Sequence, residues 1–102
     1  MYQIVSIRHP DLADGLWYLR LPEKIATDDT PTTGSYQLDI HWSRAADGWF
    51  FEKVPVAGLE GTIEGKITAS QDAVDYSLTM TNESKETWPR AMAFLCFNYC
   101  RA

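Results

Sequence analysis

This sequence has few cysteines, no long hydrophobic run and no recognisable secretory leader, and each absence excludes a class of protein. Two cysteines among 102 residues are too few for a disulfide framework. The longest apolar run, residues 91–97, is far shorter than a membrane-spanning helix of about 20 residues. The first eight residues lack the basic and long apolar segments of a secretory leader. We therefore expect a cytoplasmic protein, unless a leader has been removed from the chain.

Basic residues are also scarce. Nine Lys and Arg against fourteen Asp and Glu give a formal net charge of −5. A negative field repels the phosphate backbone of nucleic acids and anionic membrane surfaces, and no local cluster of Lys or Arg offsets it. We therefore expect neither a nucleic-acid partner nor a membrane partner.

Catalytic and cofactor-binding motifs are missing as well. The sequence contains no Gly-x-Ser-x-Gly turn, no His-Glu-x-x-His helix and no glycine-rich phosphate loop. Cys96 and Cys100 would lie roughly 13 Å apart in a strand, too far for a disulfide, whereas in a helix they would share a face and could supply two metal ligands. We predict no catalytic residue, no cofactor and no metal site, and we favour a non-enzymatic protein.

Aromatic residues, in contrast, are abundant: four Trp, five Tyr and four Phe make up 13% of the chain. Strands favour aromatic side chains, and Trp is rarely buried completely. We predict that Trp17 and Trp49 line a ligand-binding groove, and that His41, on the polar face of a predicted strand, is a third candidate. An aromatic floor beside carboxylates and amides suits a carbohydrate, and it suits a protein partner equally.

Alternation of apolar and polar residues predicts an all-β fold. The polar, breaker-rich stretch 23–34 predicts a long loop. The best-defined unit is a β-hairpin of 62–69 and 74–81, joined by a tight loop at 70–73. Segment 91–100 is apolar on nearly every side, and we favour a strand over a helix there. We predict one antiparallel β-sandwich-like domain, 1–102, of about seven strands: 2–7, 16–21, 35–42, 49–54, 62–69, 74–81 and 91–100.

One stretch of the sequence has a familiar order of motifs. Residues 74–84 read Val-Asp-Tyr-Ser-Leu-Thr-Met-Thr-Asn-Glu-Ser, and Trp88-Pro89 and then Ala-Phe-Leu-Cys at 93–96 follow. This order resembles uncharacterised bacterial β-sandwich domains of the mutarotase-like supersandwich type, over residues 74–96. The resemblance implies a sandwich fold, related to shapes found in carbohydrate-processing proteins. It also implies further strands after the cysteine-containing one, so we expect either a truncated domain or one completed by another subunit.

The predicted strand 91–100 also indicates a partner. Phe94 lies on one of its faces, and Leu95, Phe97 and Tyr99 lie on the other. A strand that is apolar on both faces needs cover on both, which either a second subunit or a central position in the sheet would provide. We predict that these four residues form a homo-oligomer interface. The functions considered are first a self-associating interaction or structural domain, second a carbohydrate or small-molecule binding module, and third a fragment of a carbohydrate-active enzyme.

Overall fold

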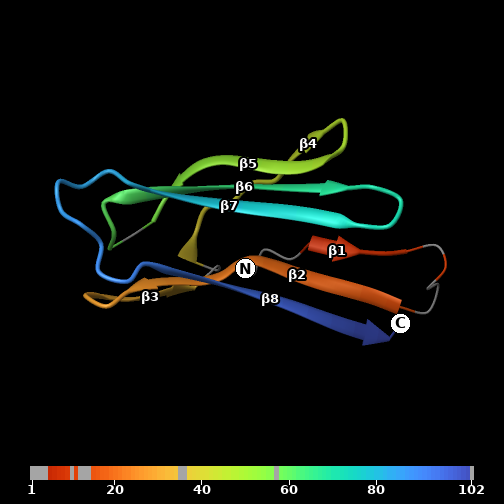
Figure 1. Ribbon diagram of the computed structural model, residues 1–102, viewed down its shortest axis with the longest axis horizontal. Helices are drawn as coiled ribbons and strands as arrows, with labels where there is room; N and C mark the ends of the chain where they lie inside the picture. The colour runs from red at the N-terminus through yellow and green to blue at the C-terminus, as the bar shows by residue number, and fades with distance from the viewer. Residues whose placement is uncertain (1–4, 10, 12–14, 35–36, 57, 102) are drawn as a thin grey trace.

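The computed structural model describes residues 5–9, 11, 15–34, 37–56 and 58–101. Within these residues the protein is built from eight strands in two antiparallel sheets of four strands each, which confirms the all-β, sandwich-like prediction. The two sheets lie one above the other along the length of the molecule (Figure 1). The first sheet contains β1 (Val5–Ile7), β2 (Gly15–Thr27), β3 (Thr30–Gly34) and β8 (Met92–Arg101), and the second contains β4 (Ser43–Ala45), β5 (Gly48–Pro55), β6 (Gly61–Ala69) and β7 (Val74–Asn82).

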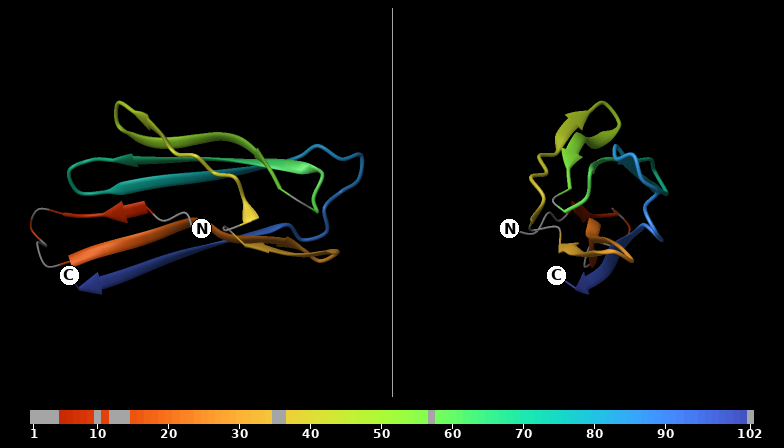
Figure 2. Two further views of the ribbon diagram at one scale, coloured as in Figure 1. Left: turned by 180° about the vertical axis from the view of Figure 1, so that it is seen from behind. Right: turned by 90° about the vertical axis from the view of Figure 1, so that its left-hand side faces the viewer.

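The long strand β2 organises the first sheet. It pairs with β8 from Gly15 to Ala26, so β8 occupies one of its two edges. The short strands β1 and β3 share the other edge, at opposite ends of β2. The second sheet runs in the order β4-β5-β6-β7, so β7 is an edge strand. The end-on view in Figure 2 shows the two layers with the segment after β3 passing from one to the other.

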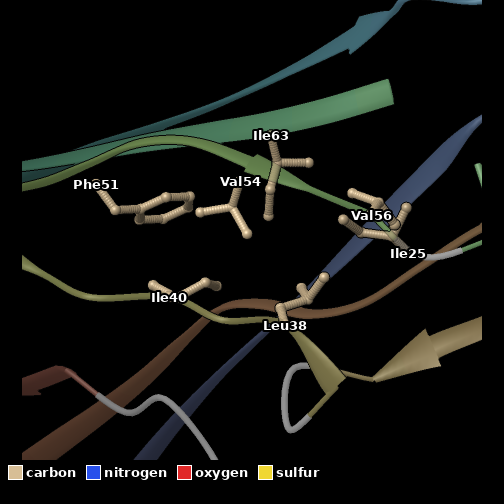
Figure 3. Packing of buried hydrophobic residues seen from close by; sticks show 7 residues of the cluster. All are labelled: Ile25, Leu38, Ile40, Phe51, Val54, Val56 and Ile63. Carbon is tan, nitrogen blue, oxygen red and sulfur yellow. The ribbon is translucent and has the colours of Figure 1, made fainter. Parts of the chain in front are cut away.

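Aliphatic side chains from both sheets fill the space between them. Figure 3 shows Phe51, Val54 and Ile63 of the second sheet pointing toward the segment that carries Leu38 and Ile40. All five are buried. Two connected clusters make up the core, one with Ile25, Leu38, Ile40, Phe51, Val54, Val56 and Ile63, and one with Leu19, Leu21 and Ile67.

The predicted hairpin is present as β6 and β7. Ile63 and Ile67 are buried, and the Ser70 amide donates to the Ala73 carbonyl across the connecting turn at 2.9 Å. On the inward face of β7, Tyr76 is 48% exposed. Its strand lies at the edge of the sheet, where the first sheet covers it less.

The predicted loop at 23–34 is wrong. The chain continues as β2 to Thr27, turns, and returns as β3. The Thr27 and Thr30 hydroxyls bond each other at 2.7 Å, so the polar residues that resemble loop sequence build the turn of a hairpin. Pro22 does not end β2, because it lies where the pairing of β2 with β8 shifts register and no ladder donor is needed.

For the strand predicted at 35–42, the alternation of buried and exposed residues is correct in the described part, but the predicted pairing into a sheet is wrong. Leu38 and Ile40 are buried, whereas Asp39 and His41 are exposed, as the alternation predicted. The described part of this segment, 37–42, is not hydrogen-bonded into either sheet, because it crosses from β3 to β4. Positions 35 and 36, and the start of the predicted first strand at 2–4, lie outside the described residues.

Candidate functional site

The ambiguous C-terminal segment is strand β8, and its register with β2 fixes which side chains share a face. Phe97 lies opposite Leu19, and Tyr99 lies opposite Trp17. Directly opposite residues in an antiparallel pair lie on the same face of the sheet. Because Leu19 is buried in the core, Phe97 and Tyr99 project from the face that points toward the second sheet.

Despite this orientation, the four predicted interface residues are all exposed. The exposed fractions are 55% for Phe97, 57% for Tyr99, and 41% for both Phe94 and Leu95. Phe94 projects from the opposite face of β8, where the Lys24 ammonium lies 5.0 Å from its ring centre. The second sheet therefore does not fully cover β8 at Phe97 and Tyr99. Large apolar side chains are exposed to solvent on both faces of this one strand.

The backbone of β8 also presents an open edge. Within the described residues this strand pairs with β2 alone, so its outer row of amides and carbonyls has no strand beside it. Edge strands of soluble domains are commonly protected by being short or by carrying Lys, Pro or inward-pointing charges. The strand is ten residues long, contains no Lys or Pro, and has Arg101 as its sole charged residue.

An apolar groove lies beside this edge, between β8 and the edge strand β7 of the other sheet. Its volume is about 400 Å³. We call it the edge groove. Its walls are formed by Leu21, Tyr76, Leu78, Met80, Ala93 and Leu95, together with Phe94.

A second concave feature, the end cleft, is lined by residues of β1 and of the turns after β4 and β6. These elements lie at the same end of the sandwich (Figure 1). Its volume is about 720 Å³, within the range of about 300–1,000 Å³ that is usual for small-molecule sites. The predicted ligand residues Trp17 and Trp49 both line it, one from each sheet. The structure thus brings together two side chains that are 32 positions apart in the sequence.

Each tryptophan of the end cleft has an aromatic or cationic neighbour. The Arg44 guanidinium lies 5.6 Å from the ring centre of Trp49, a cation–π contact that favours one orientation of the indole. The Trp17 and Tyr99 ring centres are 5.1 Å apart. Trp17 therefore connects the end cleft to the exposed residues of β8.

The two turns of the cleft are held against each other. The Ala69 amide donates to the Asp47 carbonyl at 3.0 Å, which joins the β4–β5 turn to the end of β6. Gly48 permits this approach, because a Cβ there would lie 1.9 Å from the Ile67 carbonyl oxygen. The polar part of the wall includes Arg8, His9, Arg44, Asp47, Gln71 and Asp72, which single-residue reasoning from the sequence did not select.

The third predicted ligand residue, His41, lies away from the end cleft. It is exposed, its Nε2 atom is 2.8 Å from Asp39 Oδ1, and it borders a separate hollow of about 290 Å³. No group of three or more His, Cys, Asp or Glu side chains suited to holding a metal ion is found in the described residues. The part of the chain that the structure describes also contains no helix with the length and hydrophobicity of a membrane span.

The sequence and fold were compared with protein-family models, curated proteins and solved structures, and none of them matches the chain. The functional inferences that follow therefore depend on the geometry of this molecule.

Proposed function

We propose that this protein is an interaction domain that associates with a second copy of itself through β8. The observation that carries the proposal is a ten-residue edge strand with an open backbone edge and exposed Phe, Leu and Tyr side chains. A twofold dimer that pairs the two β8 edges in antiparallel register would satisfy the outer backbone groups of both copies. Cross-strand neighbours in the paired strands would also shield part of their exposed Phe, Leu and Tyr side chains.

The charge distribution supports a second copy as the occupant. In a twofold interface the same surface meets itself, so any charge at its centre meets an equal charge. The chain as a whole carries −5, yet β8 has no Asp or Glu, and its single Arg is the last residue of the strand. Two β8 strands can therefore meet without like-charge repulsion at their centre, which few other stretches of this acidic chain would allow.

The proposal retains the cytoplasmic location expected from the sequence. Cys96 is a free thiol on the partly exposed face of β8. Thiols persist in reducing compartments, where disulfides are rare.

Sedimentation analysis of the purified chain, with Phe97→Lys as the variant, tests the dimer. Phe97 is about half exposed, so its burial contributes about 1 kcal/mol per copy. Both copies carry the substitution, so the dimer loses about 2 kcal/mol of binding free energy, which weakens its affinity roughly 30-fold. Trp49→Lys is the matched control, because Trp49 is an exposed aromatic residue away from β8, and we expect it to leave the dimer unchanged.

Two results would overturn the proposal. One is a clean monomer at a concentration of about 100 µM, which would leave the β8 edge to a strand from another polypeptide. The other is a dimer that Trp49→Lys weakens and Phe97→Lys does not, since the interface would then lie at the end cleft, which Trp49 lines. Far-UV circular dichroism of each variant shows whether the β structure is retained.

A further inference from the structure

The end cleft has the composition of a binding site with an apolar floor and a polar rim. Val5, Ile7 and Val74 are only partly buried where they line it, and Ile67 behind them is part of the core. The space between the sheets therefore opens to solvent at this end. A ligand seated there would remove from water apolar surface that the two sheets do not cover themselves.

The rim of the end cleft carries balanced charge. Arg8 and Arg44 supply two positive charges, and Asp47 and Asp72 supply two negative ones. Such a rim offers both donors and acceptors, but it does not favour a ligand with a large net charge of either sign. This balance distinguishes the cleft from the rest of the molecule, which is acidic.

His9 adds a defined donor to the same rim. Its Nδ1 atom accepts a hydrogen bond of 3.1 Å from the Asp11 amide. A neutral imidazole that accepts at Nδ1 carries its proton on Nε2. The ring therefore has a donor nitrogen available on its other side.

We propose that the end cleft binds a neutral sugar ring, with Trp49 and Trp17 as the aromatic surfaces and the Asp, Arg and Gln side chains as hydroxyl partners. The C–H face of a pyranose is apolar and flat enough to lie on an indole, whose face is electron-rich. Its hydroxyls are both donors and acceptors, so they match a rim that contains carboxylates, guanidinium groups and an amide. Trp49 remains 41% exposed beside Arg44, so part of its indole is available for this contact.

The proposal is tested by titrating the purified chain with neutral sugars and following tryptophan fluorescence and heat of binding. The probes are glucose, galactose, mannose, xylose, cellobiose, maltose and lactose, with glucose 6-phosphate as the charged comparison. We expect saturable binding of at least one neutral sugar, and weaker or no binding of the phosphorylated one. Trp49→Ala is expected to weaken the binding at least tenfold, a loss that an aromatic contact of about 1.4 kcal/mol would produce.

Two further variants separate binding from folding. Asp72→Asn removes a rim charge from an exposed turn and is expected to weaken the sugar complex. Asp75→Asn makes the same change three residues along, at an exposed position outside the cleft lining, and is expected to have no effect. Phe97→Lys should leave sugar binding unchanged, so failure of the dimer and failure of the sugar site are distinguishable.

Three results would overturn the sugar site. The first is the absence of a saturable response to every neutral sugar up to about 10 mM, a concentration that would detect even millimolar affinity. The second is binding that Trp49→Ala leaves unchanged in a variant with native circular dichroism. The third is tighter binding of glucose 6-phosphate than of any neutral sugar, which would contradict the argument from the balanced rim.

Discussion

Replacing Gly65 by alanine tests the packing between the two sheets at its tightest point. Gly65 lies in β6 directly opposite Phe51 of β5, and its position between Ile63 and Ile67 places it on the inward face. A Cβ there would lie 2.3 Å from Cε1 of the Phe51 ring. The ring cannot swing away freely, because it is buried and makes an edge-to-face contact with Trp42 at a centroid distance of 4.8 Å.

Two opposing effects set the size of the change. Overpacking a close-packed core costs about 1–3 kcal/mol, whereas alanine in a strand interior is favoured over glycine by about 0.5–1 kcal/mol. The packing loss is larger, so Gly65→Ala should destabilise the protein by about 1–2 kcal/mol. At roughly 4–8 °C per kcal/mol for a domain of this size, the unfolding temperature should fall by about 5–15 °C.

Urea unfolding followed by circular dichroism measures the effect, with Phe51→Leu as the partner in a double-mutant cycle. In the Phe51→Leu background the ring is absent, so Gly65→Ala should be neutral or stabilising. An equal loss of stability in both backgrounds would show that Phe51 does not restrict this position and would refute the reasoning. The measurements are repeated at several protein concentrations, because dimer formation would make the apparent stability concentration-dependent.

Two further predictions concern the second sheet. Leu78→Asp places a charge beside both core clusters and should cost about 3 kcal/mol, whereas Ser77→Asp lies opposite Lys66 on the outer face and should be neutral; equal losses in urea unfolding would mean that the register is wrong. Gly48→Ala should be more damaging than Gly65→Ala, because its Cβ would meet the Ile67 backbone rather than a side chain; a smaller fall in unfolding temperature would contradict this order.

The strands that the sequence predicted well are those in which apolar and polar side chains alternate and the apolar face packs against the core. In β6 and β7 the period-two alternation, the polar outer face and the short turn agree with one another, and the structure has all three. Segment 91–100 was harder to predict because both of its faces are apolar, and the open side of the sandwich explains why: neither face of β8 is fully covered within the described residues.

The misjudged stretches fail for a local physical reason. Threonine and aspartate at 27–30 are typical of loops, but here the Thr27 and Thr30 hydroxyls form hydrogen bonds within a two-residue turn between β2 and β3, one of them accepted from the Asp29 amide. The alternation at 37–42 reports burial, not pairing, so a segment that crosses between the sheets gives the same pattern as a strand. Neither distinction is encoded in residue type alone.

For the candidate sites, residue type indicated which side chains to consider, whereas the topology determines which of them lie close together. The excess of tryptophan indicated a groove, but Trp17 and Trp49 line the same cleft because the two sheets meet at one end, which no local pattern contains. His41, chosen for its strand position, lies elsewhere because its segment crosses between the layers. The contact of Trp17 with Tyr99 then places one residue at the boundary of both proposed surfaces. Sugar bound at the end cleft and a second copy bound at β8 would therefore contact the two sides of a single aromatic pair.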